Sequence, residues 1–192
     1  IYFNPSDFER PLGFNILDFY DEQDKHRVVN GFLGLLTKMF DPNGQGITGP
    51  RFEQAMRNAM LTAMSVKGSS LIEVWRILTD YDWVKNEWLD KVQDDLVKRY
   101  WTDQIAKTSD FHKSEILGYI VSKLDRFVTN IAMRNIIGQT ESSFNVRKVM
   151  DEGKILFVNL SKGDLGENNS SLLVSVLVNL ILIAALRRRG KA

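Results

Sequence analysis

The stretch SKGDLG, residues 161–166, combines glycines and a lysine, the residue types that could cradle a phosphate group. It follows an apolar run, as a phosphate-binding loop follows a strand. The loops of nucleotide hydrolases, however, read GxxxxGK followed by Ser or Thr, and this stretch does not. The apolar run also ends in Asn159, Leu160 and Ser161 rather than in acidic residues that could hold magnesium. We therefore predict an ordinary connection between a strand and a helix, and no catalytic residue.

Other residue types that carry out chemistry are scarce. The chain contains no cysteine, which excludes thiolate catalysis, disulfides and cysteine-based metal sites. The two histidines, His26 and His112, are far apart and have no partners at ligand spacing. The acidic residues between positions 87 and 95 alternate with lysines, which is typical of a solvated helical face. The sequence predicts no metal site and no pair of catalytic carboxylates.

Basic residues remain as candidates for binding. Lys and Arg number 25 against 24 Asp and Glu, so the net charge of +1 gives no overall attraction to nucleic acid or membrane. A basic surface would have to be local. The possible basic contacts are Arg51, Arg57, Arg187, Arg188 and Arg189.

The residues from about 21 to 130 show the period of amphipathic helices. Apolar residues recur at spacings of three and four in residues 21–40 and again after Pro50, which suits a first helical turn. Ser70 and Ser109 are expected to cap later helices. This pattern predicts an all-α unit. The aromatic residues expected in its core are Phe32, Phe52, Trp75, Trp83, Trp88 and Trp101.

Strand character is confined to two places. Ile155–Leu160 is apolar except for Asn159, which favours a strand buried on both faces of a parallel sheet. Such a strand needs neighbours, and the only other strand candidate is the segment at Tyr2 and Phe3. Because Ile1 already lies in this strand-like segment, we expect the chain to be a piece of a longer polypeptide.

The final helix is expected to be buried in a protein core. Leu172–Leu186 is apolar except for two polar residues, and arginines follow it, as they follow many membrane spans. As a helix this run covers only about 22 Å, short of a hydrocarbon core of about 30 Å. We therefore predict packing against a sheet rather than a membrane segment. The arginines then form a C-terminal turn that complements the helix dipole.

Several phrases together resemble one family. They are IYFNPSDFERPLGFN, GPRFEQAMRNAML, RFVTNIAMRNIIGQTESSFNVRKVMDEGKILFVNLSKGDLGENNSSLL and AALRRR. Their order and spacing resemble the TraG/TraD-like conjugative coupling ATPases of type IV secretion, in the FtsK/HerA branch of P-loop motors. The resemblance covers essentially the whole chain, although none of these phrases is a catalytic signature.

The resemblance implies a mainly α fold, with one or two strands and a buried helix from a RecA-like α/β domain. Residues 1–20 would be a strand and an ordered loop of that nucleotide-binding domain, residues 21–130 its all-α insertion, and residues 131–192 the return into it. The parent protein would use ATP and Mg²⁺ to move DNA or a relaxase complex as a hexamer. It would act in the cytoplasm, at the inner face of the bacterial membrane. This chain lacks both Walker motifs and is predicted to be inactive by itself.

No catalytic residue transfers from the family. The positions that match are Gly49, Pro50, Arg51, Arg57, Asn58, Arg134, Asn135, Gly138, Gln139, Asn159, Ser161, Lys162 and Gly163. Most suit turns, caps or bracing contacts. Arg134 and Lys162 are the candidates for work near nucleotide or DNA, since cations bind phosphate. A stand-alone helical module that binds a protein partner, without ATPase connection, remains the alternative, and a short membrane-anchored helper is a third reading.

Overall fold

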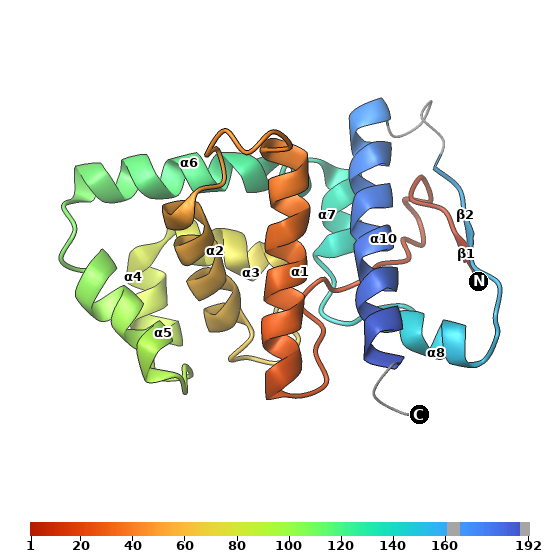
Figure 1. Ribbon diagram of the computed structural model, residues 1–192, viewed down its shortest axis with the longest axis horizontal. Helices are drawn as coiled ribbons and strands as arrows, with labels where there is room; N and C mark the ends of the chain where they lie inside the picture. The colour runs from red at the N-terminus through yellow and green to blue at the C-terminus, as the bar shows by residue number, and fades with distance from the viewer. Residues whose placement is uncertain (161–165, 189–192) are drawn as a thin grey trace.

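Helices dominate the chain, and the prediction of a mainly α protein is confirmed. The computed structural model describes residues 1–160 and 166–188 (Figure 1). Its helical elements in chain order are α1 (Glu22–Phe40), α2 (Pro50–Ala63), α3 (Leu71–Thr79), α4 (Tyr81–Trp83), η1 (Val84–Trp88), α5 (Asp95–Arg99), η2 (Tyr100–Ile105), α6 (Asp110–Val128), α7 (Ile131–Ile137), α8 (Val146–Asp151) and α10 (Glu167–Arg188). The strands are β1 (Tyr2–Phe3) and β2 (Phe157–Val158).

Capping residues fix where the longer helices begin. The Asp21 side chain accepts a backbone hydrogen bond at the start of α1. Pro50 occupies the first turn of α2, where its missing N–H is no loss. Ser70 and Glu73 form a reciprocal capping box at α3, and Ser109 caps α6. These starts agree with the sequence analysis, because a cap depends on only a few neighbouring residues.

Two segments of the helical unit are wound more widely than an α-helix. In η1 the Leu89 N–H donates to the Val84 carbonyl at 3.1 Å, and in η2 the Ala106 N–H donates to the Trp101 carbonyl at 3.0 Å. The sequence period predicts ordinary helices here. An apolar period over so few residues does not separate an α turn from a π turn, since the two differ by a single residue.

The predicted aromatic core is correct for four residues and wrong for two. The buried members are Phe32, Phe52, Trp88 and Trp101. Trp75 and Trp83 are only partly buried. The Trp75 indole N–H donates to the Asp125 carboxylate at 3.0 Å, and the Arg76 guanidinium lies 4.0 Å from the centre of the Trp83 ring. Polar and cationic partners hold both rings at the edge of the core.

The two strands pair in parallel at one end of the molecule, opposite α4 and α5 (Figure 1). Tyr2 lies opposite Phe157, and Phe3 opposite Val158. The pairing of Ile155–Leu160 with the N-terminal segment is as expected, but its burial on both faces is not. The side chains of Ile155 and Phe157 are 67% and 63% exposed. In the described part of the chain the sheet has two strands, and the side chains of the paired residues Tyr2 and Phe157 are both exposed.

Helix α10 is longer than predicted, and its main neighbours are helices. It has 22 residues, or about 33 Å, and packs against α1 and α8 rather than chiefly against the strands. Gly31 of α1 allows a close approach, because a Cβ there would lie 2.7 Å from Cδ1 of Ile183. Four apolar side chains, each a turn apart on the helix, remain exposed: Val174, Val178, Leu182 and Leu186.

The predicted length of this helix, which excluded a membrane segment, is therefore wrong. The window Asn169–Leu186 has a mean hydropathy of 2.1 and, by length and composition alone, is long and apolar enough to cross a bilayer. A core helix of a soluble protein passes the same test. The helix contacts α1 and α8, and 39% of this window is buried inside the protein. The absence of a membrane segment stays a prediction.

Candidate functional site

Arg134, the first sequence candidate, lies in an open groove beside α7. The groove has a volume of about 420 Å³ and is lined by Pro11, Ile72, Arg134, Asn135, Gly138 and Gln139. Four of these residues belong to the set that carries the family resemblance. The structure thus brings Arg134, Asn135, Gly138 and Gln139 together at one surface.

Most residues of the groove hold the N-terminal loop against α7. Gln139 Nε2 donates to the carbonyls of Pro11 and Asn135 at 3.1 and 2.8 Å, which ties the N-terminal loop to α7. Gly13 lies so close to this amide that a Cβ there would be 2.3 Å from Gln139 Cδ. Gly138 likewise has no room for a side chain beside Ile72. The glycine and amide positions therefore have structural roles.

Arg134 is the chemically available group of this groove. Its guanidinium is exposed and makes one weak hydrogen bond, from Nη1 to the Val128 carbonyl at 3.4 Å. No ion pair found among the described residues includes it. It can therefore bind an anionic group, but the groove supplies no acid or base beside it. The groove is suited to binding rather than to catalysis.

The other basic candidates do not join Arg134. Arg57 donates to Oδ1 of Asn30 at 2.7 Å and so links α2 to α1. Arg51 is exposed at the start of α2 and lines a different cavity. Lys162 and Arg189 lie outside the described residues, as do the side chains of Arg187 and Arg188 at the end of α10. The structure thus separates Arg51 from Arg134 instead of forming one basic face.

The Arg51 cavity lies between the loop before α2 and the helix α6. Its volume is about 300 Å³, and its walls are formed mainly by Ile47, Pro50, Phe52, Ile116, Tyr119 and Ile120. The cavity was not predicted from the sequence, because the loop residues and the α6 residues are far apart along the chain. The only local signal was the glycine-rich loop at 41–50.

A buried carboxylate organises this loop. Asp41 accepts backbone N–H bonds from Gln45 at 2.5 Å, Gly46 at 2.9 Å and Thr48 at 3.3 Å. Burial alone would raise the pKa of the Asp41 carboxyl, but the backbone N–H groups outweigh it and lower the pKa below its ordinary value. Gly44 and Gly46 adopt positive φ angles of 66° and 84°, which lets the loop close around the carboxylate.

Cations and aromatic rings alternate beside the same cavity. Lys123 Nζ lies 4.5 Å from the Tyr119 ring centre and 5.7 Å from that of Phe40. The Arg126 guanidinium lies 5.8 Å from the Phe40 ring centre. Lys38, two residues before Phe40 in the last turn of α1, is exposed. None of these residues was predicted from the sequence as a site residue.

Another cavity, of about 230 Å³, separates the loop at residues 14–20 from the C-terminal half of α10. Its polar residues bond mainly to one another: Ser142 donates to Asp18, and Asn145 donates to the Tyr20 hydroxyl at 2.5 Å. Arg147 pairs with Asp151 at 3.3 Å. The bonds to Asp18 and Tyr20 hold the N-terminal loop against residues 142–145.

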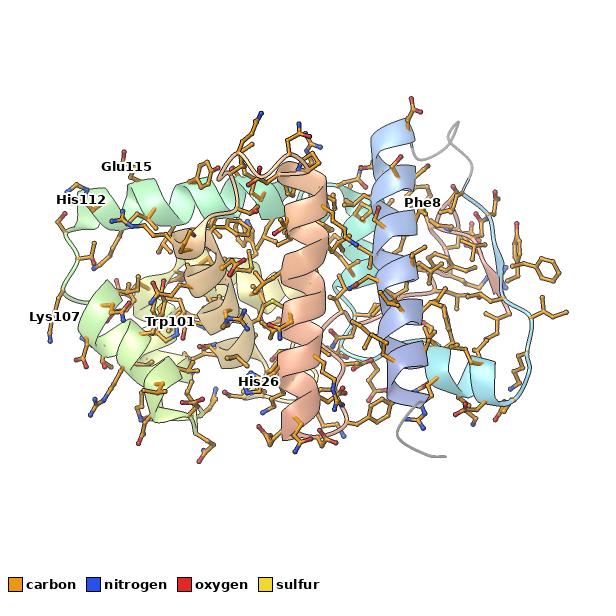
Figure 2. All side chains as sticks on the ribbon, in the orientation of Figure 1. Phe8, His26, Trp101, Lys107, His112 and Glu115 are labelled. Carbon is orange, nitrogen blue, oxygen red and sulfur yellow. The ribbon has the colours of Figure 1, made fainter. Side chains whose placement is uncertain are left out.

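The histidines lie apart, on different helices (Figure 2). His112 lies 3.6 Å from Glu115 on an exposed face of α6, and His26 is exposed on α1. In the described ranges, no group of three or more His, Cys, Asp or Glu side chains could hold a metal ion. The lining of the Arg134 groove includes no carboxylate that could bind Mg²⁺. The family resemblance would place ATP and Mg²⁺ in the parent protein, outside this chain.

Comparisons with known proteins give no relative. No family model, no curated protein and no solved structure matches the chain.

Proposed function

We propose that this chain is part of an ATP-driven DNA-translocating motor of conjugation or type IV secretion. Its helical unit, residues 21–130, would engage the transported substrate, DNA or a relaxase complex. The parent protein would bind ATP and Mg²⁺ outside this chain and work as a hexamer. Its place would be the cytoplasm, at the inner face of the bacterial membrane.

The pairing of β1 with β2 carries this proposal. The Ile1 amino group donates to the Ile155 carbonyl at 2.8 Å, across 154 positions of the sequence. A parallel pair needs a crossover of only a dozen or so residues. Here the crossover contains a whole helical unit, which is the geometry expected when a helical domain is inserted between adjacent strands of one sheet.

The uncovered apolar surfaces support the same proposal. Tyr2, Ile155 and Phe157 are exposed around the strand pair, as is the apolar stripe of α10 at residues 174–186. Soluble proteins rarely leave contiguous apolar patches exposed unless another element or protein covers them. Further strands of a RecA-like sheet would provide that cover.

The gene offers the sharpest test. The reading frame should extend upstream into GxxxxGK followed by Ser or Thr, and downstream into an apolar strand that ends in Asp-Glu. The protein encoded by that frame should hydrolyse ATP faster when DNA is added. A start codon just before Ile1 and a stop codon after Ala192 would overturn the proposal and favour the stand-alone binding module.

The stand-alone module, the alternative, is favoured by the cavity beside Arg51. A preformed apolar cavity next to cations is typical of a binding surface and needs no nucleotide. A motor subunit can carry such a surface too. The reading frame, and not the cavity, therefore decides between the two functions.

A further inference from the structure

The cavity beside Arg51 is an apolar pocket held in shape by polar contacts around it. Ile47 and Pro50 form one wall, and Ile116 and Ile120 of α6 form the other. The Tyr119 hydroxyl donates to the Ile47 carbonyl at 2.8 Å and so fixes the loop against α6. The pocket can therefore receive an apolar group without first rearranging.

Side chains on the opposite side of the loop keep it in place. Thr48 Oγ1 donates to Thr37 Oγ1 of α1 at 3.1 Å. The Asp41 carboxylate binds the backbone of residues 45–48 from inside the loop. A pocket that is already formed loses little conformational entropy when a partner binds.

The rim of the pocket is cationic. Arg51 lines it directly, and Lys123 lies one helical turn beyond Tyr119 and Ile120 on α6. Arg126 continues the same side of α6 toward Phe40. Among the ion pairs of the described ranges, none involves Arg51, Lys123 or Arg126.

The carboxylates nearest in sequence do not neutralise this rim. Asp41 is turned into its own loop, and Asp125 accepts the indole N–H of Trp75. Glu53 is two residues from Arg51 and therefore points away from it on the helix surface. Glu115 lies by His112, toward the start of α6. An acidic partner is the complement that this rim lacks.

We propose that the pocket between residues 46–52 and α6 binds an acidic peptide segment of a partner protein. An apolar side chain of the peptide enters between Ile47 and Ile116, and its flanking carboxylates face Arg51 and Lys123. The pocket walls are mostly aliphatic, which suits a leucine better than a stacked nucleobase. This binding site goes beyond the proposed motor, which does not require it.

Fluorescence anisotropy with the 192-residue chain tests the proposal. The probe is a short fluorescein-labelled peptide in which two leucines are flanked by glutamates. We expect saturable binding, weakened about tenfold or more by the double variant Arg51→Glu, Lys123→Glu. The variant Ile116→Trp fills the pocket with a larger side chain and should also weaken binding about tenfold.

Two controls separate this site from general electrostatics. The variant Lys85→Glu, Arg99→Glu changes the net charge equally at exposed cations of η1 and α5, and should bind the peptide like the parent chain. A peptide with the leucines replaced by serines should bind about tenfold more weakly. Melting temperatures of all variants show whether each remains folded.

Other outcomes overturn the proposal. Absence of peptide binding, or binding unaffected by the Arg51 and Lys123 reversals, would exclude this pocket as an acidic-peptide site. Equal binding of the serine peptide would exclude a role for the apolar walls. An oligo-dT probe that binds more tightly than the peptide, and is lost in the same double variant, would assign the rim to nucleic acid instead.

Discussion

The indole N–H of Trp101 donates a 2.8 Å hydrogen bond to Oγ1 of Thr62, and both residues are fully buried. This bond joins η2 to α2 inside the helical unit, where Figure 2 places Trp101. It gives the largest buried side chain of the unit a polar partner. A buried N–H without an acceptor is costly, so this pair fixes how η2 sits against α2.

Thr62→Val should destabilise the chain by about 1–3 kcal/mol. The substitution keeps the shape of the side chain but leaves the Trp101 N–H buried without an acceptor. Urea unfolding followed by tryptophan fluorescence measures the change. Thr62→Ser, which keeps the hydroxyl, is the control and should retain more stability than the valine variant. Equal stability of the valine variant and the parent chain would contradict the bond's role.

Two glycine substitutions should change stability in opposite directions. Gly13→Ala would place a Cβ 2.3 Å from Gln139 Cδ and 2.6 Å from the Ile136 carbonyl, so we expect a loss of about 1–3 kcal/mol. Gly34→Ala, on an exposed face of α1 with open space around it, should gain about 0.5–1 kcal/mol. Thermal unfolding compares them. A tolerated alanine at position 13 would mean that the N-terminal loop does not pack on α7 as described.

The Asp41 loop should lose stability in acid. The folded-state pKa of Asp41 lies below the ordinary value of about 3.9, so its stabilising contribution is present above that pH and is lost as the pH falls through the folded pKa. Asp41→Asn should therefore melt earlier than the parent chain at neutral pH. The two curves should converge as the pH falls below the ordinary pKa and through the lowered folded-state pKa of Asp41.

The comparison with the variant isolates Asp41 from other acids. The pKa of Glu152 is also lowered, chiefly by a hydrogen bond from Lys154, so the parent chain loses stability from more than one carboxylate. Glu152 is present in both proteins and cancels in the difference. A gap in melting temperature that persists unchanged at low pH would show that the charge of Asp41 does not hold the loop.

Local sequence signals predicted where the helices begin. The contacts between helices depend on long-range packing and could not be predicted in this way. Pro50 and Ser70 act through their immediate neighbours, so their sequence context was sufficient. Lys123 contacts the ring of Phe40 only because α1 ends beside α6, and no short sequence motif predicts this contact. The Asp41 loop was recognised as a break between helices, but the inward turn of its carboxylate depends on the folded backbone.

The candidate site shows the same division. Arg134 was predicted as a candidate from its residue type and from the family resemblance. In the structure Asn135, Gly138 and Gln139 line the same groove. The hydrogen bond from Arg57 to Asn30 could not be predicted from the sequence, since it joins two helices. The length of α10 was underestimated because its first turn is polar and was counted with the preceding loop. The role of Lys162 stays a prediction.

The chain should show at most weak, salt-sensitive binding of DNA, and the slope of log affinity against log salt should be small. Its net charge is +1, Arg57 is engaged by Asn30, and the exposed candidates Arg51 and Arg134 line separate cavities. Few phosphates would be neutralised, and each contributes about 0.9 to the slope of log affinity against log salt. Anisotropy titrations with labelled DNA over a range of salt concentrations measure this slope. Tight, salt-insensitive and sequence-specific binding would contradict it.

The isolated chain should neither bind nor hydrolyse ATP, although we propose that its parent does both. Phosphate binding in P-loop proteins requires a ring of backbone amides, a lysine on the β and γ phosphates and a hydroxyl on magnesium. The sequence contains no GxxxxGK followed by Ser or Thr to supply them. An arginine such as Arg134 can stabilise a transition state only on a nucleotide that is already held.

Isothermal titration with ATP and magnesium, followed by a phosphate-release assay, tests this expectation directly. We expect no heat of binding and no turnover above the rate without protein. The decisive variant is Lys162→Ala, because Lys162 belongs to the only stretch of the sequence that resembles a phosphate loop. Micromolar affinity or turnover that disappears in this variant would make residues 161–166 a phosphate site. That result would overturn both the ordinary-loop interpretation and the proposal that ATP binds outside this chain, since a complete nucleotide site would then lie within it.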